Sequence, residues 1–268
     1  MSGTLSDTIL SLRPPSVKEV FFPALALNRK GMFWYAQRKV GRDSTIEFLE
    51  RLEQADALRK QGRSLTFVCN HLSYADSHVI EVLMIRNGFA DLAEHLIHIA
   101  GQKTFQLARR FMTRSLNTIR VYQPSAKVDK QVAKKMNTKA LKWAAHLKRR
   151  GYSLLVFPEG TRSRTAHFNA RGANPRASIY FYKSLVIPMA LMGSEKIMPV
   201  GKLWPRAATV RLRVGNPIDP KMVERKIKER QPQMTEREFR QTLMLEIMTH
   251  INALLDPEYQ DAENHLPQ

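Results

Sequence analysis

Cysteine is almost absent from this chain of 268 residues, in which Cys69 is the one cysteine. A single cysteine excludes an intrachain disulfide and a zinc site built on several thiolates, which fits a reducing compartment. Long apolar runs are lacking too, because no stretch approaches the roughly 18 apolar residues that span a bilayer. The sequence therefore predicts a cytoplasmic protein that is soluble or peripherally attached to the cytoplasmic face of the membrane.

Acidic residues are few relative to basic ones. The chain has 24 Asp and Glu against 43 Lys and Arg, which gives a formal net charge of +19. Residues 101–150 hold fourteen of these cations and a single acid, Asp129. Such an excess of positive charge indicates an anionic partner. Nucleic acid, a phosphate-bearing substrate and an acidic membrane surface each satisfy this requirement.

Short apolar runs rich in strand-forming residues alternate with helical patterns after residue 60. The runs are 65–69, 96–100, 118–122, 154–157, 185–192 and 209–214. Residues 128–150 carry an apolar stripe at helical spacing, and residues 235–238 form a capping box ahead of a C-terminal helix. This alternation is typical of an α/β fold with a mainly parallel or mixed central sheet flanked by helices.

Residues 1–60 have a different pattern and are predicted to form a small helical segment ahead of an α/β domain over residues 61–268. Within this segment, residues 20–27 and 32–35 are apolar and aromatic, with Arg29 and Lys30 between them. Apolar groups flanked by cations either pack into a core or lie in a lipid interface. Both alternatives, core packing and membrane contact, are open for this segment.

Residues 70–76 read Asn-His-Leu-Ser-Tyr-Ala-Asp, directly after the first apolar run. In one interpretation Ser73 and Asp76 form the capping box of a helix, and His71 is a polar loop residue. In another, His71 lies at the rim of the sheet, where open α/β folds bind ligands, and Asp76 orients its imidazole. A third interpretation adds His78 and makes the three residues a metal site.

A second motif, Phe-Pro-Glu-Gly-Thr-Arg-Ser-Arg, occupies residues 157–164. Pro158 ends a strand, and Gly160 lets the backbone turn. Two arginines, two residues apart, can bind a phosphate through their guanidinium groups. A solvated basic loop is the alternative for this stretch taken alone.

Together the two motifs resemble those of the glycerolipid acyltransferases, which have Asn-His, four residues and Asp, followed later by Phe-Pro-Glu-Gly-Thr-Arg. Residues 99–103, 119–122 and 186–191 are similar to further blocks of that family. The N-terminal segment and residues 160–164 resemble most the soluble glycerol-3-phosphate acyltransferases. Gln123 stands near where many lysophosphatidate enzymes have an arginine, and Arg171-Gly172-Ala173-Asn174 replaces the usual Phe-Lys-x-Gly stretch. These two departures weaken the assignment to the second acylation step more than that to the first.

This resemblance implies an acyltransferase of phospholipid biosynthesis that needs no metal and no cofactor. It would move a fatty acyl group from acyl-CoA or acyl carrier protein to the hydroxyl of glycerol-3-phosphate, and 1-acylglycerol-3-phosphate is the alternative acceptor. His71 is the implied general base, and Asp76 holds its ring. The residues expected to bind the acceptor or to shape its site are Glu159, Gly160, Thr161, Arg162, Arg164, Lys103 and Arg120.

Two rival interpretations belong to other functional classes. A basic module that binds nucleic acid would account for residues 101–150, but it leaves both motifs unexplained and lacks a helix-turn-helix signature. A metal hydrolase built on His71, Asp76 and His78 is the other rival. The expected partners are therefore an acyl-thioester donor, a phosphate-bearing glycerol acceptor and an anionic membrane surface, and not nucleic acid.

Overall fold

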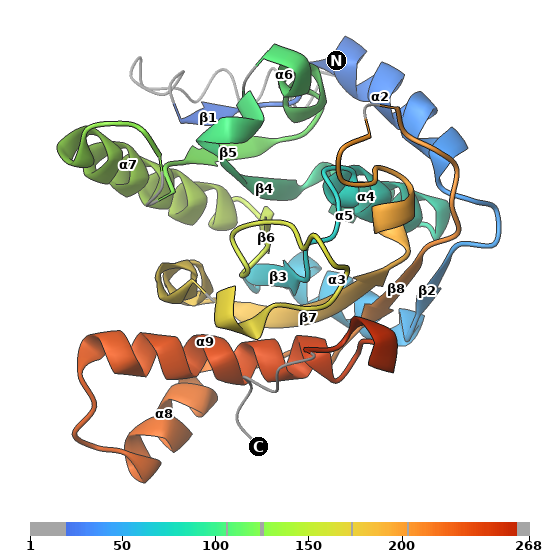
Figure 1. The fold of residues 1–268 in the computed structure, drawn as a ribbon. Coiled ribbons are helices and arrows are strands. Elements are labelled where there is room, and N and C mark those ends of the chain that lie inside the picture. Colours follow the sequence, from blue (N-terminus) through green and yellow to red (C-terminus); the bar gives the residue numbers. More distant parts are fainter. Residues whose placement is uncertain (1–19, 106, 124–125, 173, 203, 262–268) are drawn as a thin grey trace.

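The computed structural model describes residues 20–261 apart from 106, 124–125, 173 and 203, and these residues form a mixed α/β fold around one sheet (Figure 1). The strands of the described part are β1 (Phe21–Phe22), β2 (Thr45–Glu47), β3 (Leu65–Cys69), β4 (Leu96–Gly101), β5 (Thr118–Val121), β6 (Ser153–Val156), β7 (Leu185–Met192) and β8 (Arg211–Val214). Its α-helices are α2 (Ala26–Lys39), α3 (Leu49–Lys60), α4 (Asp76–Arg86), α5 (Ala90–Glu94), α6 (Leu107–Arg114), α7 (Lys130–Lys148), α8 (Pro220–Arg230) and α9 (Glu236–Asn252).

Five parallel strands form the centre of the sheet, in the spatial order β5-β4-β6-β3-β7. β8 pairs with β7 in the antiparallel direction, and the short strands β1 and β2 lie at the two edges. The expectation of a mainly parallel or mixed sheet is confirmed. Because the central strands are parallel, the loops that follow them all leave from one edge of the sheet, where α/β folds bind ligands.

Helices cover both faces of the sheet (Figure 1). On one face, Met136 of α7 and Ile247 of α9 belong to the same buried cluster as Val68 of β3. On the other face, α3, α4 and α5 pack against Phe67 and Cys69 of the same strand. β3 is thus buried on both sides, as its continuous apolar run predicts.

The long helices begin where the sequence offers capping residues. Asp129 accepts hydrogen bonds from the first backbone N–H groups of α7, and Thr235 and Glu238 form a reciprocal capping box at α9. Side-chain acceptors at these positions satisfy N–H groups that have no partner within the helix. The helices expected over residues 128–150 and from residue 235 are therefore confirmed.

The N-terminal segment is where the structure departs from the sequence-based expectation. Residues 1–19 lie outside the described residues, and residues 20–60 contain α2 and α3 but also β1 and β2, which belong to the main sheet. Within this segment, which was expected to be helical, Thr45–Glu47 instead pairs with β8, and α3 begins at Leu49. Strands of two or three residues are too short to show an alternating pattern. The domain division at residue 60 stays a prediction.

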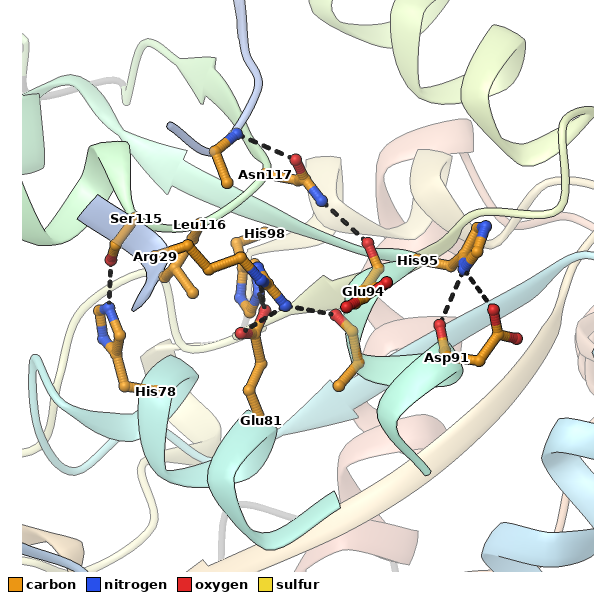
Figure 2. Close-up of polar contacts among 12 residues, drawn as sticks. Arg29, His78, Glu81, Asp91, Glu94, His95, His98, Ser115, Leu116 and Asn117 are labelled. Carbon is orange, nitrogen blue, oxygen red and sulfur yellow. Dashed lines mark hydrogen bonds and ion pairs between the residues drawn. The ribbon is translucent and has the colours of Figure 1, made fainter. Parts of the chain in front are cut away.

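A buried polar network joins α2 to α4 and β4 (Figure 2). The guanidinium of Arg29 lies 3.0 Å from Oε2 of Glu81, and Nε2 of His98 donates to Oε1 of the same carboxylate at 2.9 Å. One turn before Glu81 on α4, Nε2 of His78 donates to Oγ of Ser115 at 2.7 Å. Because buried charges are costly unless they are paired, these contacts fix the place of α2 against the sheet.

Candidate active site

The two sequence motifs meet at the edge where the parallel strands end. His71 follows β3, and residues 157–164 follow β6, which pairs directly with β3. The backbone N–H of Ser163 donates to the carbonyl oxygen of His71 at 2.7 Å. Strand pairing therefore brings into contact two loops that lie far apart in the sequence.

His71 and Asp76 form a hydrogen-bonded pair. Nδ1 of His71 donates to Oδ2 of Asp76 at 2.8 Å, which places the proton of a neutral imidazole on Nδ1 and leaves the lone pair on Nε2. The carboxylate is fully buried, whereas the His71 side chain is 18% exposed. The imidazole also stacks on Phe157, with ring centroids 4.3 Å apart. This is the geometry of a general base with an orienting carboxylate.

Asp76 also accepts hydrogen bonds from backbone N–H groups just before α4, which is part of what the capping interpretation predicts. Its Oδ2 accepts from the backbone N–H groups of Leu72 and Ser73 at 2.7 and 2.9 Å. The Ser73 hydroxyl, however, accepts from the N–H of Ala75 rather than from that of Asp76, and α4 begins at Asp76. The expected capping box is therefore half formed, and one carboxylate both supports the helix start and holds His71.

The buried side chain of Glu159, in the second motif, is hydrogen-bonded to the loop that carries His71. Its Oε1 accepts from the backbone N–H of His71 at 2.7 Å, and its Oε2 accepts from that of Asn169 at 3.1 Å. Burial raises the pKa of Glu159 to about 8, although both N–H groups favour the carboxylate. Because both oxygens are engaged by the backbone, Glu159 shapes the site and does not present its carboxylate to a ligand.

Gly160 turns the chain immediately after this buried carboxylate. Its φ is +67°, a value that L side chains rarely adopt. The carbonyl oxygen of Gly160 accepts a hydrogen bond from Nε2 of Gln123 at 2.5 Å. Gln123, which follows β5, therefore supports the turn of the second motif from across β4, the strand between β5 and β6.

The remaining members of the second motif lie at the surface. Thr161 and Arg164 are exposed, and Arg162 is partly buried. The Arg162 guanidinium lies 4.1 Å from the ring centroid of Tyr74, a residue of the first motif. The structure thus brings Arg162 beside the loop that carries His71.

Lys103 and Arg120 lie farther along the same edge of the sheet. Lys103 is exposed in the short 3-10 helix Gln102–Phe105, which follows β4. Arg120 belongs to β5, and its guanidinium lies 5.3 Å from the ring centroid of Phe22 and 5.6 Å from that of Tyr122. β4 is the neighbour of β6, and β5 is one strand farther. These two cations therefore flank the motif loops instead of belonging to them.

Asn70 and Ser194 make contributions that were not predicted from the sequence. The buried amide of Asn70 pairs with Leu191 of β7: Nδ2 donates to its carbonyl at 2.8 Å, and Oδ1 accepts from its N–H at 2.7 Å. Oγ of Ser194 donates to Oδ1 of Asp76 at 2.7 Å. The only local signal was the asparagine that precedes His71, because the partners lie 121 and 118 residues away.

The structure does not assemble the metal site of the third interpretation. The imidazole of His78 is hydrogen-bonded to Ser115 in the network beneath α2 (Figure 2). No group of three or more His, Cys, Asp or Glu among the residues described by the structure is placed to hold a metal ion. Cys69 is buried, and burial raises the pKa of its thiol well above the ordinary value, so a reactive thiolate is not favoured.

Comparison with known proteins identifies the family and a similar fold. A family model described as Acyltransferase matches residues 44–201. Among solved structures, the chain is similar to the 1-acyl-sn-glycerophosphate (LPA) acyltransferase PlsC from Thermotoga maritima, with a TM-score of 0.50 and 19% sequence identity, covering 84% of this chain and 81% of that one. At this identity the likeness shows the fold. No curated protein matches the chain significantly.

Proposed function

The chain belongs to the acyltransferase family, and on this premise we propose that it moves a fatty acyl group from an acyl-thioester to a hydroxyl of a phosphate-bearing glycerol. The observation that carries the proposal is the 2.8 Å hydrogen bond between Nδ1 of His71 and Oδ2 of Asp76. With Nδ1 engaged, Nε2 is the nitrogen that accepts a proton from the acceptor hydroxyl.

In the proposed reaction, Nε2 of His71 takes the hydroxyl proton while the acceptor oxygen attacks the thioester carbonyl. The tetrahedral intermediate then expels the thiolate, which receives that proton from the imidazolium. Asp76 stabilises the imidazolium between these two steps. An ester C–O bond forms and the thioester C–S bond breaks, so the reaction needs no acyl-enzyme, and Cys69 has no chemical role.

Two acceptors fit this chemistry, because both carry a phosphate that Arg162 and Arg164 can bind. The sequence motifs favour glycerol-3-phosphate. The similar solved structure is named as a 1-acyl-sn-glycerophosphate acyltransferase, which favours the 1-acyl form. The donor, acyl-CoA or acyl carrier protein, is anionic in either case and suits a chain with a net charge of +19.

Peripheral attachment to the cytoplasmic face of an anionic membrane is part of the proposal. Among residues 20–261, outside the gaps given above, no helix is both long and apolar enough to cross a bilayer. The outward side of α2 carries Leu27 and Trp34, which are 83% and 58% exposed, together with the exposed cations Lys30 and Arg38. Apolar and aromatic side chains among cations suit the interface of an anionic bilayer.

The test is thiol release from a fatty acyl-CoA, with glycerol-3-phosphate and its 1-acyl form offered at matched concentrations. The wild-type protein is expected to release thiol when an acceptor is present, and the higher kcat/KM identifies the preferred acceptor. His71→Ala is expected to lower kcat about 1,000-fold, because the general base is lost. Its circular dichroism spectrum is expected to be unchanged.

His95→Ala is the matched control, since His95 precedes β4 and lies at the opposite end of that strand from the candidate site. It is expected to keep the wild-type rate. Wild-type turnover in His71→Ala would contradict the proposed mechanism. Absence of transfer from both acyl-CoA and acyl carrier protein to either acceptor would contradict the function.

A further inference from the structure

The carboxylate of Asp76 is held from two sides. Its Oδ2 accepts three hydrogen bonds, which come from Nδ1 of His71 and from the backbone N–H groups of Leu72 and Ser73. Its Oδ1 accepts from the hydroxyl of Ser194 at 2.7 Å. Asp76 and Ser194 are both completely buried. The reaction proposed above uses the contact with His71 and gives no role to the contact with Ser194.

Ser194 is fixed by the backbone around it. It begins the 3-10 helix Ser194–Lys196 after β7, and its carbonyl oxygen accepts from the N–H of Ile197 at 3.0 Å. Gly193, which precedes it, has a φ of +88°, and a Cβ at this position would lie 2.5 Å from the carbonyl oxygen of Thr209. Only glycine permits this turn without a rearrangement. The hydroxyl of Ser194 therefore has a defined position.

The sheet fixes the distance between Ser194 and the loop of His71. β7 pairs directly with β3, and the amide of Asn70 ties the end of β3 to Leu191 near the end of β7. The donors to Oδ2 of Asp76 all come from residues 71–73, on one side of the carboxylate. The donor to Oδ1 comes from the 3-10 helix that follows β7, so it fixes the carboxylate plane and the direction in which Oδ2 meets the imidazole.

We propose that Ser194 is a positioning residue: its hydroxyl fixes the carboxylate of Asp76 and, through it, the orientation of the His71 ring. This inference rests on the proposed function, because it assigns Ser194 to the same reaction. Ser194 acts through Asp76 and not by contact with the substrate. Hydrogen bonds that orient the histidine and carboxylate ligands of metal sites change activity about tenfold or more when they are removed, and we expect a loss of the same order here.

Ser194→Ala tests the proposal in steady-state kinetics and in the 1H NMR spectrum. The variant is expected to lower kcat about tenfold, with both KM values changed less than about twofold, because the loss affects the base and not substrate binding. Ser194→Thr restores a hydroxyl and is expected to recover most of kcat. The low-field resonance of the His71 Nδ1 proton, assigned by its absence in His71→Ala, is expected to shift in Ser194→Ala.

Ser184→Ala is the matched control, since Ser184 is buried and hydrogen-bonded to Thr66 Oγ1 at 3.0 Å, away from Asp76. It is expected to keep the wild-type kcat and the wild-type resonance. If Ser194→Ala does not fold, Ser194→Cys, a weaker donor of similar size, replaces it with the same expected decrease.

A folded variant at Ser194 with wild-type kcat and an unmoved resonance would overturn the proposal. An equal loss of kcat in Ser184→Ala would also overturn it, because the effect would then be a general response to a lost buried hydroxyl. If the wild-type protein transfers no acyl group, the proposed function fails. The NMR comparison needs no substrate, so it still decides whether Ser194 orients the pair.

Discussion

Among single residues, Arg162 has a contact that suggests how the acceptor phosphate of the proposed function would be bound. Its guanidinium lies 4.1 Å from the ring centroid of Tyr74, which belongs to the His71 loop. A guanidinium that stacks on an aromatic ring keeps its N–H donors in its own plane, directed away from the ring. Donors in this arrangement can bind a phosphate in a bidentate manner. A phosphate held there would place the glycerol of the acceptor near the base.

Arg162→Ala is expected to raise the KM for the phosphate-bearing acceptor at least about tenfold, with a much smaller change in the KM for acyl-CoA. The reason is that only the acceptor phosphate loses its bidentate partner. Arg162→Lys keeps the charge without the planar fork, so an intermediate KM is expected. Initial-rate kinetics with each substrate varied in turn gives both constants.

Arg176→Ala is the control for this prediction, because Arg176 is an exposed arginine outside both motifs. Both KM values are expected to stay at the wild-type level in this variant. Equal increases of the two KM values in Arg162→Ala would show that the phosphate of the acceptor binds elsewhere.

At this scale the sequence revealed the contacts that are local and missed those that cross the sheet. His71 and Asp76 lie within one loop, so their spacing alone suggested that they could pair. The partners of Asp76 and Asn70 on β7 depend on β7 lying beside β3. No local pattern encodes the order of strands in a sheet, so Ser194 could not be identified from its own neighbourhood.

Among the elements, α4 connects the candidate site to the buried network beneath α2. Asp76 is its first residue, and His78 follows within the same turn. Nε2 of His78 donates to Ser115, whose hydroxyl donates to the carbonyl of Met112, and its Nδ1 has no hydrogen-bond partner among the described residues. A proton on Nδ1 would therefore be buried without an acceptor. Accordingly, burial lowers the pKa of His78 to about 4.

This lowered pKa makes the stability of the protein sensitive to acid. His78 binds a proton near its ordinary pKa of 6.5 when the chain is unfolded, but only near about 4 when it is folded. Its contribution to stability is therefore complete above pH 6.5 and is lost as the pH falls toward 4. Between about pH 7 and pH 5 the loss amounts to about 2 kcal/mol.

His78→Gln removes the titrating group and keeps a hydrogen-bonding side chain near Ser115. Over the same pH interval, the free energy of unfolding is expected to fall about 2 kcal/mol less in this variant than in the wild-type protein. Urea unfolding at the two pH values measures both changes. The raised pKa of Glu159 increases the free energy of unfolding as the pH falls, but this contribution is the same in the wild-type protein and the variant. Equal losses in the two proteins would show that His78 is not the responsible group.

The sequence identified the elements that have a long apolar run or stripe and missed the two short edge strands. The six apolar runs correspond to β3–β8, and the stripe over residues 128–150 corresponds to α7. β1 pairs with β5 and β2 pairs with β8, and each has too few residues to show an alternating apolar pattern. Thr45–Glu47, which joins the sheet, was for this reason included in the segment expected to be helical. Tertiary pairing, which a local pattern does not record, decided that stretch.

Over the whole molecule, part of the positive charge lies at the start of α7. This helix presents exposed Lys130, Lys134 and Lys135 in its first two turns and contains no acid. Because α7 follows β5, it begins at the same edge of the sheet as the motif loops. A field of this sign would attract the acyl-thioester donor, the acceptor phosphate and the anionic bilayer of the proposed function.

Binding to anionic vesicles is the expected consequence for the intact protein. Sedimentation with vesicles that contain anionic phospholipid is expected to exceed that with neutral vesicles and to weaken as salt is added, because Lys and Arg near the surface each contribute about 1 kcal/mol at low salt.

The double variant Leu27→Ser and Trp34→Ser is expected to bind about tenfold more weakly, since it removes the exposed apolar groups of α2. Met222→Ser, which changes an exposed apolar residue of α8, is expected to bind like the wild-type protein. Normal binding of the double variant would show that the apolar side chains of α2 do not contribute to membrane binding. Binding that does not change with salt would contradict the electrostatic part of the proposal.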